Sequence, residues 1–193
     1  MNKKLISHIF FLTAFIAGIV IFPHPAVSRT RDVTLKNIVI ANSRDNLLAY
    51  FTVDKAFTDK INDALLKGVP ISFSFFISIH KKRDAWLDKK IVDMKISNTL
   101  KYNTLKQEFT IVRPWEGGQP FVTKSMEEAK TMMCDVYSLT IAPLNLLRKG
   151  EQYRIGIKAE TNRSSQPRYL QYLLLFVSMW KFETRWYEVN IIY

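Results

Sequence analysis

Residues that could bind a metal or act as nucleophiles are scarce in this chain. It contains three histidines and one cysteine, and His8 and His24 lie in an N-terminal stretch typical of an export leader. His80 and Cys134 are left for the rest of the chain. Structural zinc usually takes about four nitrogen or sulfur ligands and catalytic zinc about three protein ligands, so we expect neither a metal nor another cofactor. An intrachain disulfide is excluded, and we expect Cys134 to pack as a small apolar side chain rather than act as a reactive thiol or link two copies.

The acidic residues allow few catalytic arrangements. His80 and Asp84 would suit part of a nucleophilic triad, but a triad also needs a serine on a sharp turn, and the chain has no Gly-x-Ser-x-Gly motif. Asp84, Asp88 and Asp93 form the closest group of carboxylates, and two such groups are enough for glycoside hydrolysis. Alternate acids along a turn and a strand are more typical of a solvated face. We therefore expect no enzymatic activity, with a carboxylate-based hydrolase as the least favoured alternative.

Basic and aromatic residues indicate contact chemistry instead. The formal net charge is +11, which favours anionic lipid head groups, acidic glycans or other polyanions, although a solvated basic surface would give the same excess. We expect no nucleic acid partner. Most of the four tryptophans should be buried, whereas Trp115 lies in a loop rich in proline and glycine and should be exposed. The candidate contact surface comprises Arg83, Trp86, Arg113 and Trp115.

The first 28 residues predict the compartment. Lys3 and Lys4 precede an apolar stretch over residues 9–22, and Ala26-Val27-Ser28 places small side chains where signal peptidase cuts. The alternative is an uncleaved membrane anchor, which the apolar length nearly allows. Either reading predicts that residues 29–193 form a single exported domain, periplasmic or anchored to the inner membrane and facing the periplasm.

The remaining chain is dominated by the alternation of apolar and polar residues, which predicts strands with one buried face. Residues 71–79 show it most clearly, with isoleucine and phenylalanine on one side and serine on the other. Residues 113–120 resemble a hairpin loop more than a phosphate-binding loop. The sequence predicts strands over residues 33–40, 47–53, 71–79, 92–97, 105–111, 152–159 and 186–192, and leaves residues 170–178 undecided between helix and strand.

Two short helices carry readable boundaries. Thr58 is expected to cap a helix over residues 59–67, which Gly68 would close. Ser125 and Glu128 form a capping box that opens a helix ending near residue 135. Several short strands with two minor helices predict a mostly β fold, an antiparallel β-sandwich in which an immunoglobulin-like architecture is compatible with the strand count.

The spacing of the larger residues resembles that of a known bacterial family. The matching pieces are Gly68-Val-Pro70, then Arg83 with Trp86 and Asp88, then Leu100-Lys-Tyr102-Asn-Thr-Leu105, and finally Trp180 with Thr184-Arg-Trp186-Tyr187. Together they resemble the domain-of-unknown-function 4390 family over residues 33–193. The resemblance implies a single-domain exported or membrane-anchored protein without catalytic residues to carry over. In some relatives the coding region lies beside that of a membrane sensor kinase of the nitrogen-regulation type, which implies a signalling role.

Three classes of function follow from these patterns. The favoured one is a non-catalytic envelope module that binds an envelope protein, for which the resemblance suggests a membrane sensor kinase, because β-sandwiches commonly serve recognition. The second is a binder of anionic lipid, glycan or another polyanion that uses the basic excess and Trp115. The third is the carboxylate-based hydrolase. The sequence does not predict the oligomeric state.

Overall fold

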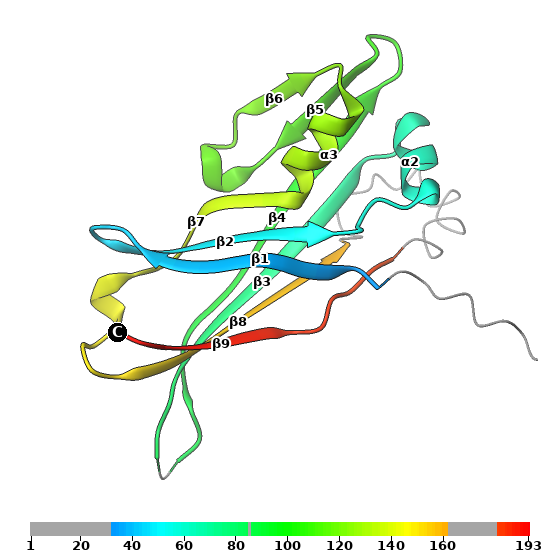
Figure 1. Cartoon of the computed structure of the whole chain (residues 1–193). Helices are drawn as coiled ribbons and strands as arrows, with labels where there is room; N and C mark the ends of the chain where they lie inside the picture. The colour runs from blue at the N-terminus through cyan, green and yellow to red at the C-terminus, as the bar shows by residue number, and fades with distance from the viewer. Residues whose placement is uncertain (1–31, 85, 162–180) are drawn as a thin grey trace, which may run out of the picture. The chain divides into compact units, whose positions relative to one another are not determined.

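The structure is a computed structural model that describes residues 32–84, 86–161 and 181–193. In these residues the strands form two antiparallel sheets, packed together as a sandwich (Figure 1). This confirms the predicted mostly β fold. The expected leader, residues 1–28, and the undecided segment, residues 170–178, lie outside the described residues.

The smaller sheet has three strands in the order β1-β2-β7. They are β1 (Thr34–Asn42), β2 (Asn46–Asp54) and β7 (Asp135–Pro143). The turn between the first two is held by Ser43, whose Oγ accepts a hydrogen bond from the Asn46 amide at 3.1 Å. The central strand β2 buries every second residue, as the alternation over residues 47–53 predicts.

The larger sheet has six strands in the order β6-β5-β4-β3-β8-β9. Ser72 and Ser74 of the central strand β3 face away from the apolar side chains, and they bond across to Thr99 and Ser97 of β4 at 2.8 and 2.9 Å. The strands are β6 (Pro120–Thr123), β5 (Glu108–Val112), β4 (Lys89–Asn103), β3 (Ile71–Lys81), β8 (Gln152–Thr161) and β9 (Tyr187–Ile192).

Both predicted helices form, α2 (Asp59–Leu66) and α3 (Met126–Cys134). Thr58 caps α2 by accepting from the Ile61 amide at 3.4 Å. Ser125 caps α3 by accepting from the Glu128 amide at 3.2 Å. The return half of the expected capping box runs through Thr123, whose hydroxyl accepts from the Ser125 amide and donates to the Glu128 carboxylate.

The core lies between the two sheets and includes one side of each helix. Phe51 of β2 meets Phe75 of β3 edge to face, with ring centroids 5.3 Å apart. Leu65 of α2 and Met133 of α3 are fully buried in the same cluster. Side chains from both sheets and both helices therefore belong to the core that surrounds the central strand β3.

Apart from β6, which extends the larger sheet beyond β5, the strand order corresponds to that of a variable-type immunoglobulin domain. β1, β2 and β7 take the places of strands A, B and E, while β5, β4, β3, β8 and β9 take those of C″, C′, C, F and G. Tyr153, buried at the start of β8, accepts a hydrogen bond from the Arg148 amide at 2.8 Å, which is the arrangement of a tyrosine corner. The buried Ile155 stands where immunoglobulin domains carry the second disulfide cysteine.

Two predictions about strands need correction. The strand expected over residues 105–111 begins at Glu108, because Asn103 folds the preceding residues into a turn in which its side chain accepts from the amides of Leu105 and Lys106, each at 3.1 Å. Leu105 is consequently 95% exposed instead of buried. The sequence also failed to predict β6 and β7. In β7, Ser138 has φ +51° and shifts the register, so the alternation on which the prediction relied is interrupted.

In the part of the chain that the structure describes, no helix combines the length and the hydrophobicity that crossing a bilayer requires.

Candidate functional site

The four residues of the candidate contact surface lie in two separate places. Arg83 and Trp86 belong to the connection between β3 and β4, whereas Arg113 and Trp115 belong to the connection between β5 and β6. The ring of Trp115 packs on Phe75, which is six strand residues, or about 20 Å, from the end of β3 at Lys81. The structure therefore does not bring the two pairs together.

Arg113 and Trp115 are part of the packing. Residues Pro114–Glu116 form a single 3-10 turn that folds back on the sheet, and the partly buried Trp115 meets Phe75 at a centroid distance of 5.9 Å. The Arg113 side chain is only 13% exposed and pairs with Glu116 at 2.5 Å. The expectation that Trp115 is exposed is wrong, because the turn brings its ring against β3.

The exposed aromatic residue of the candidate surface is Trp86. Trp86 and Leu87 are 77% and 83% exposed at the end of the β3–β4 hairpin, which extends below the other strands in Figure 1. Trp186 is also 48% exposed, so the expectation that most tryptophans are buried fails for these two, and Trp180 lies outside the described residues. Adjacent apolar side chains that are exposed to solvent favour aggregation unless they bind a partner or a membrane.

Basic residues lie on both sides of this apolar pair in the sequence, with Asp84 and Asp88 between them and the pair. Lys82 and Arg83 precede it and Lys89 and Lys90 follow it. Lys90 binds Asp93 at 2.6 Å, and this hydrogen bond and the lysine charge lower the pKa of Asp93. We call the set Lys82, Arg83, Trp86, Leu87, Lys89 and Lys90 the hairpin tip.

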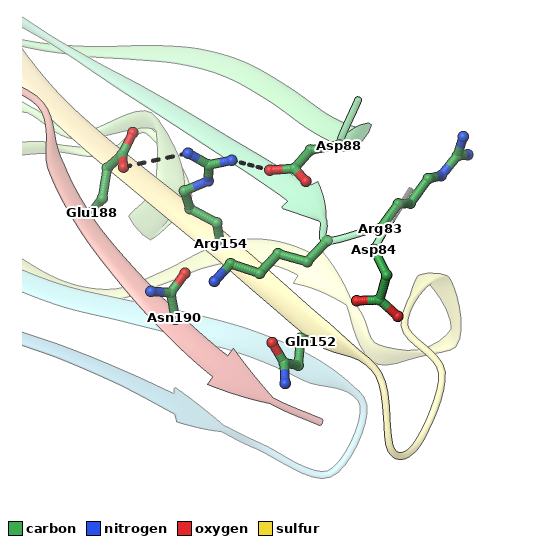
Figure 2. Close-up of a pocket in the computed structure, with 8 residues that line it drawn as sticks. Arg83, Asp84, Asp88, Gln152, Arg154, Glu188 and Asn190 are labelled. Atoms are coloured by element: carbon green, nitrogen blue, oxygen red, sulfur yellow. Dashed lines mark hydrogen bonds and ion pairs between the residues drawn. The ribbon is translucent and has the colours of Figure 1, made fainter. Parts of the chain in front are cut away.

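An ion-pair bridge fixes the base of the hairpin. The Arg154 guanidinium on β8 contacts Asp88, just before β4, and lies 3.7 Å from Glu188 of β9. Figure 2 shows the guanidinium between the two carboxylates. The Lys82 amide also donates to the Gln152 carbonyl at 2.9 Å. The hairpin is thus attached to two neighbouring strands rather than to its own pair alone.

A polar hollow of about 440 Å³ lies beside this bridge, and we call it the basal pocket. Three basic and three acidic side chains line it together with two amides, so its charges balance. In Figure 2 Asn190 lies below the bridge and Gln152 lies farther below it, while the Arg83 guanidinium points away from Arg154. The lining residues are Lys82, Arg83, Asp84, Asp88, Gln152, Arg154, Glu188 and Asn190.

The basal pocket also bears on the hydrolase alternative. Asp84 and Asp88 both line it, but Asp93 does not, and the lining includes no aromatic wall of the kind that sugar-binding clefts use. Asp88 is engaged by Arg154, and His80 forms no hydrogen bond with Asp84 within the described residues. Among those residues no group of three metal-ligating side chains occurs either.

Sequence reasoning missed most of these residues. Leu87 and the flanking lysines could have been found, because a Trp-Leu pair between two basic pairs stands in a short hairpin connection. Gln152, Arg154, Glu188 and Asn190 carry no local signal. They reach the pocket only because β8 and β9 pair in register, with Arg154 opposite Asn190.

The comparison with known families assigns the chain to one of them. A family described as "Domain of unknown function (DUF4390)" matches residues 30–190. The chain belongs to the DUF4390 family. No curated protein and no solved structure matches the chain. The resemblance seen in the spacing of the larger residues is thereby confirmed.

The motif residues of this DUF4390 domain hold its strands in place. Thr184 forms two hydrogen bonds with Ala159 of β8. Its amide donates to the Ala159 carbonyl at 2.9 Å, and its hydroxyl accepts from the Ala159 amide at 3.0 Å. Trp186 lies over Gly156, where an added Cβ would come within 3.2 Å of the ring. Asp88 forms the bridge to Arg154. These contacts explain the spacing of the motif residues by their structural roles. None of the contacts points to a chemical reaction.

Cys134 of the DUF4390 domain is expected to react slowly. Burial, with Asp135 and Asp54 nearby, raises the pKa of its thiol to about 12. Because the thiolate is the nucleophile, the native protein at pH 8 should react with a dithionitrobenzoate reagent at least about a hundredfold more slowly than the urea-unfolded chain. Absorbance of the released thionitrobenzoate measures both rates. Equal rates would show that the thiol is accessible in the folded state.

Proposed function

We propose that this protein is an exported, non-catalytic module that binds the anionic surface of a membrane through the hairpin tip. The observation that carries the proposal is the exposed pair Trp86 and Leu87, in a segment, residues 82–90, that holds four basic residues against two aspartates. Tryptophan is enriched at membrane interfaces, where its ring sits at headgroup level. Lysine and arginine beside it meet the lipid phosphates.

The apolar pair and the basic residues of the hairpin tip each contribute enough binding free energy to matter for reversible attachment to a membrane. Complete burial of a leucine contributes about 1.5–3 kcal/mol, and a tryptophan has 150–250 Å² to bury, so partial insertion of both gives a few kcal/mol. Each basic residue near an anionic surface adds about 1 kcal/mol, and the carboxylates of Asp84 and Asp88 offset a part of this gain. Neither part is sufficient for tight binding, but together they support reversible attachment. The net charge of +11 favours the same surface.

This proposal changes the order of the functions expected from the sequence. Binding of an envelope protein, including a membrane sensor kinase, stays a prediction, since no particular residue of the described surface favours it over lipid. Attachment to the membrane would place the domain beside such a kinase, so the two are compatible. The hydrolase alternative loses support, because Asp88, one of its candidate carboxylates, is engaged in an ion pair with Arg154.

The hairpin tip can be tested with a matched pair of leucines. Leu87 and Leu105 are 83% and 95% exposed, one at the tip and the other in the β4–β5 turn. In sedimentation of residues 29–193, which hold the whole described core, with phosphatidylglycerol-containing vesicles, W86A/L87A is expected to weaken binding about tenfold or more. L87A should weaken it by a part of this and L105A should leave it unchanged.

Two further results separate the alternatives. Binding by the unaltered domain should fall steeply as salt rises from 50 to several hundred millimolar, because exposed charges are screened. Equal effects of L87A and L105A, or binding that ignores lipid charge, would contradict the proposal. A photoreactive residue at position 86 that crosslinks one envelope protein reproducibly, with no lipid adduct, would favour the protein partner instead.

A further inference from the structure

Residues 82–88 connect β3 to β4, and both ends of this connection are tied to β8. At its start the Lys82 amide donates to the Gln152 carbonyl at 2.9 Å. At its end the Asp88 carboxylate contacts the Arg154 guanidinium. Neither contact belongs to the pairing of β3 with β4. A third strand therefore restrains the segment that carries the exposed tryptophan and leucine.

The contact made by Arg154 reaches from one side of β3 to the other. Arg154 lies opposite His80 of β3, whereas Asp88 directly precedes β4, the neighbour of β3 on its other side. A second guanidinium nitrogen lies 3.7 Å from Glu188 of β9, as Figure 2 shows. Because the two carboxylates contact different nitrogens, the plane of the guanidinium is fixed. The chain is thereby held directly beside Leu87.

The two aspartates beside the apolar pair are placed differently. Asp88 is paired with Arg154, and its side chain is 20% exposed. Asp84 is exposed and forms no ion pair within the described residues. A carboxylate repels an anionic membrane surface, and the guanidinium offsets this charge in Asp88. The ion pair thus reduces a repulsion next to Leu87 and restrains the chain at the same point.

We propose that Arg154 is a positioning residue for membrane binding, an inference that rests on the proposed function. Arg154 acts through Asp88, by orienting the hairpin tip and neutralising the carboxylate, rather than by a contact of its own with lipid. A tip that is ordered before docking loses less conformational entropy when it binds. Removal of the ion pair should therefore weaken binding even though every residue that meets the membrane remains.

The two aspartates supply an experiment in which opposite effects are expected. In sedimentation of residues 29–193 with phosphatidylglycerol-containing vesicles, D84N removes a repelling charge and should tighten binding about twofold to fivefold. D88N removes the same charge together with the ion pair, and should weaken binding about threefold. R154Q should weaken it about tenfold, because it also leaves a carboxylate unpaired beside the membrane. K106Q removes a positive charge beyond the far end of β4, about 45 Å along that strand, and should change binding less than twofold.

A spin label reports on the order of the hairpin tip without any membrane. The label is attached to L87C, since the buried thiol of Cys134 reacts slowly. In solution, R154Q should narrow the lines of the electron paramagnetic resonance spectrum, and K106Q should leave them unchanged. R154K keeps the charge but lacks the planar fork that engages two carboxylates. It should therefore recover only a part of the line width and of the vesicle affinity that R154Q loses.

The outcomes separate this inference from the function on which it rests. Equal tightening by D84N and D88N, or a label spectrum that R154Q does not change, would overturn the role of Arg154 while tip-dependent binding to vesicles persists. Full recovery in R154K would show that charge alone matters, which also overturns it. If W86A/L87A binds the vesicles as the unaltered domain does, the proposed function fails and the role of Arg154 in binding fails with it.

Discussion

F75A is expected to lower the free energy of unfolding by about 3–5 kcal/mol. Phe75 is fully buried in the middle of β3, and its ring is contacted edge to face by Phe51 of the opposite sheet and by Trp115 of the β5–β6 connection. Truncation removes the transfer energy of the ring and leaves a cavity between the layers. Equilibrium urea denaturation, followed by far-ultraviolet circular dichroism, measures the loss.

The neighbouring residue supplies the control for this prediction. Phe76 lies on the opposite face of β3, where it is partly exposed beneath Lys95 and Lys158. F76A removes the same ring and should cost clearly less than F75A, because water fills the space. Similar losses in the two variants would mean that the sandwich is not closed around Phe75.

N98D is expected to destabilise the fold by about 3 kcal/mol or more at pH 7. Asn98 is fully buried on β4, and its Nδ2 donates to the Met133 carbonyl at the end of α3 at 2.7 Å. The substitution removes this donor and places an ionisable carboxyl in the core. Burial disfavours the charged form, so the introduced group should have a pKa well above its value of about 3.9 in the unfolded chain.

The effect of pH on N98D follows from that shift. Between the two pKa values the folded state binds more protons than the unfolded state, so stability falls as pH rises through this window. The deficit should therefore be smaller at pH 4 than at pH 7, each measured against the unaltered protein at the same pH. N98A, which loses the hydrogen bond but adds no charge, should cost about 1–3 kcal/mol at both values. A deficit of N98D that does not change with pH would show that the site is hydrated.

Local signals account for what the sequence predicted. The alternation over residues 71–79 and the caps at Thr58 and Ser125 depend on neighbours within a few residues, and all appear in the structure. The class of the fold follows from counting such strands.

Contacts between distant segments account for what it missed. Trp115 looks exposed from its loop, but a single turn places its ring on Phe75. Trp86 looks like core material, yet the strands on both sides continue beyond the layers and carry it into solvent. Arg154 and Glu188 meet Asp88 only through the order of β3, β8 and β9. Such a register depends on the whole sheet, which no short stretch specifies.

Among the described residues, the most enclosed strand, β3, also leads into the hairpin that carries the most exposed aromatic ring, Trp86. β3 runs without interruption from the phenylalanines of the interior to the start of the hairpin. The two strands that carry the hairpin tip are already paired before it docks, so little of their conformational entropy is lost on contact. Because β3 is one continuous strand, a substitution that loosens its packing in the core would also make the position of the hairpin tip less well defined. We therefore expect β3 to tolerate fewer substitutions than its contribution to stability alone would allow.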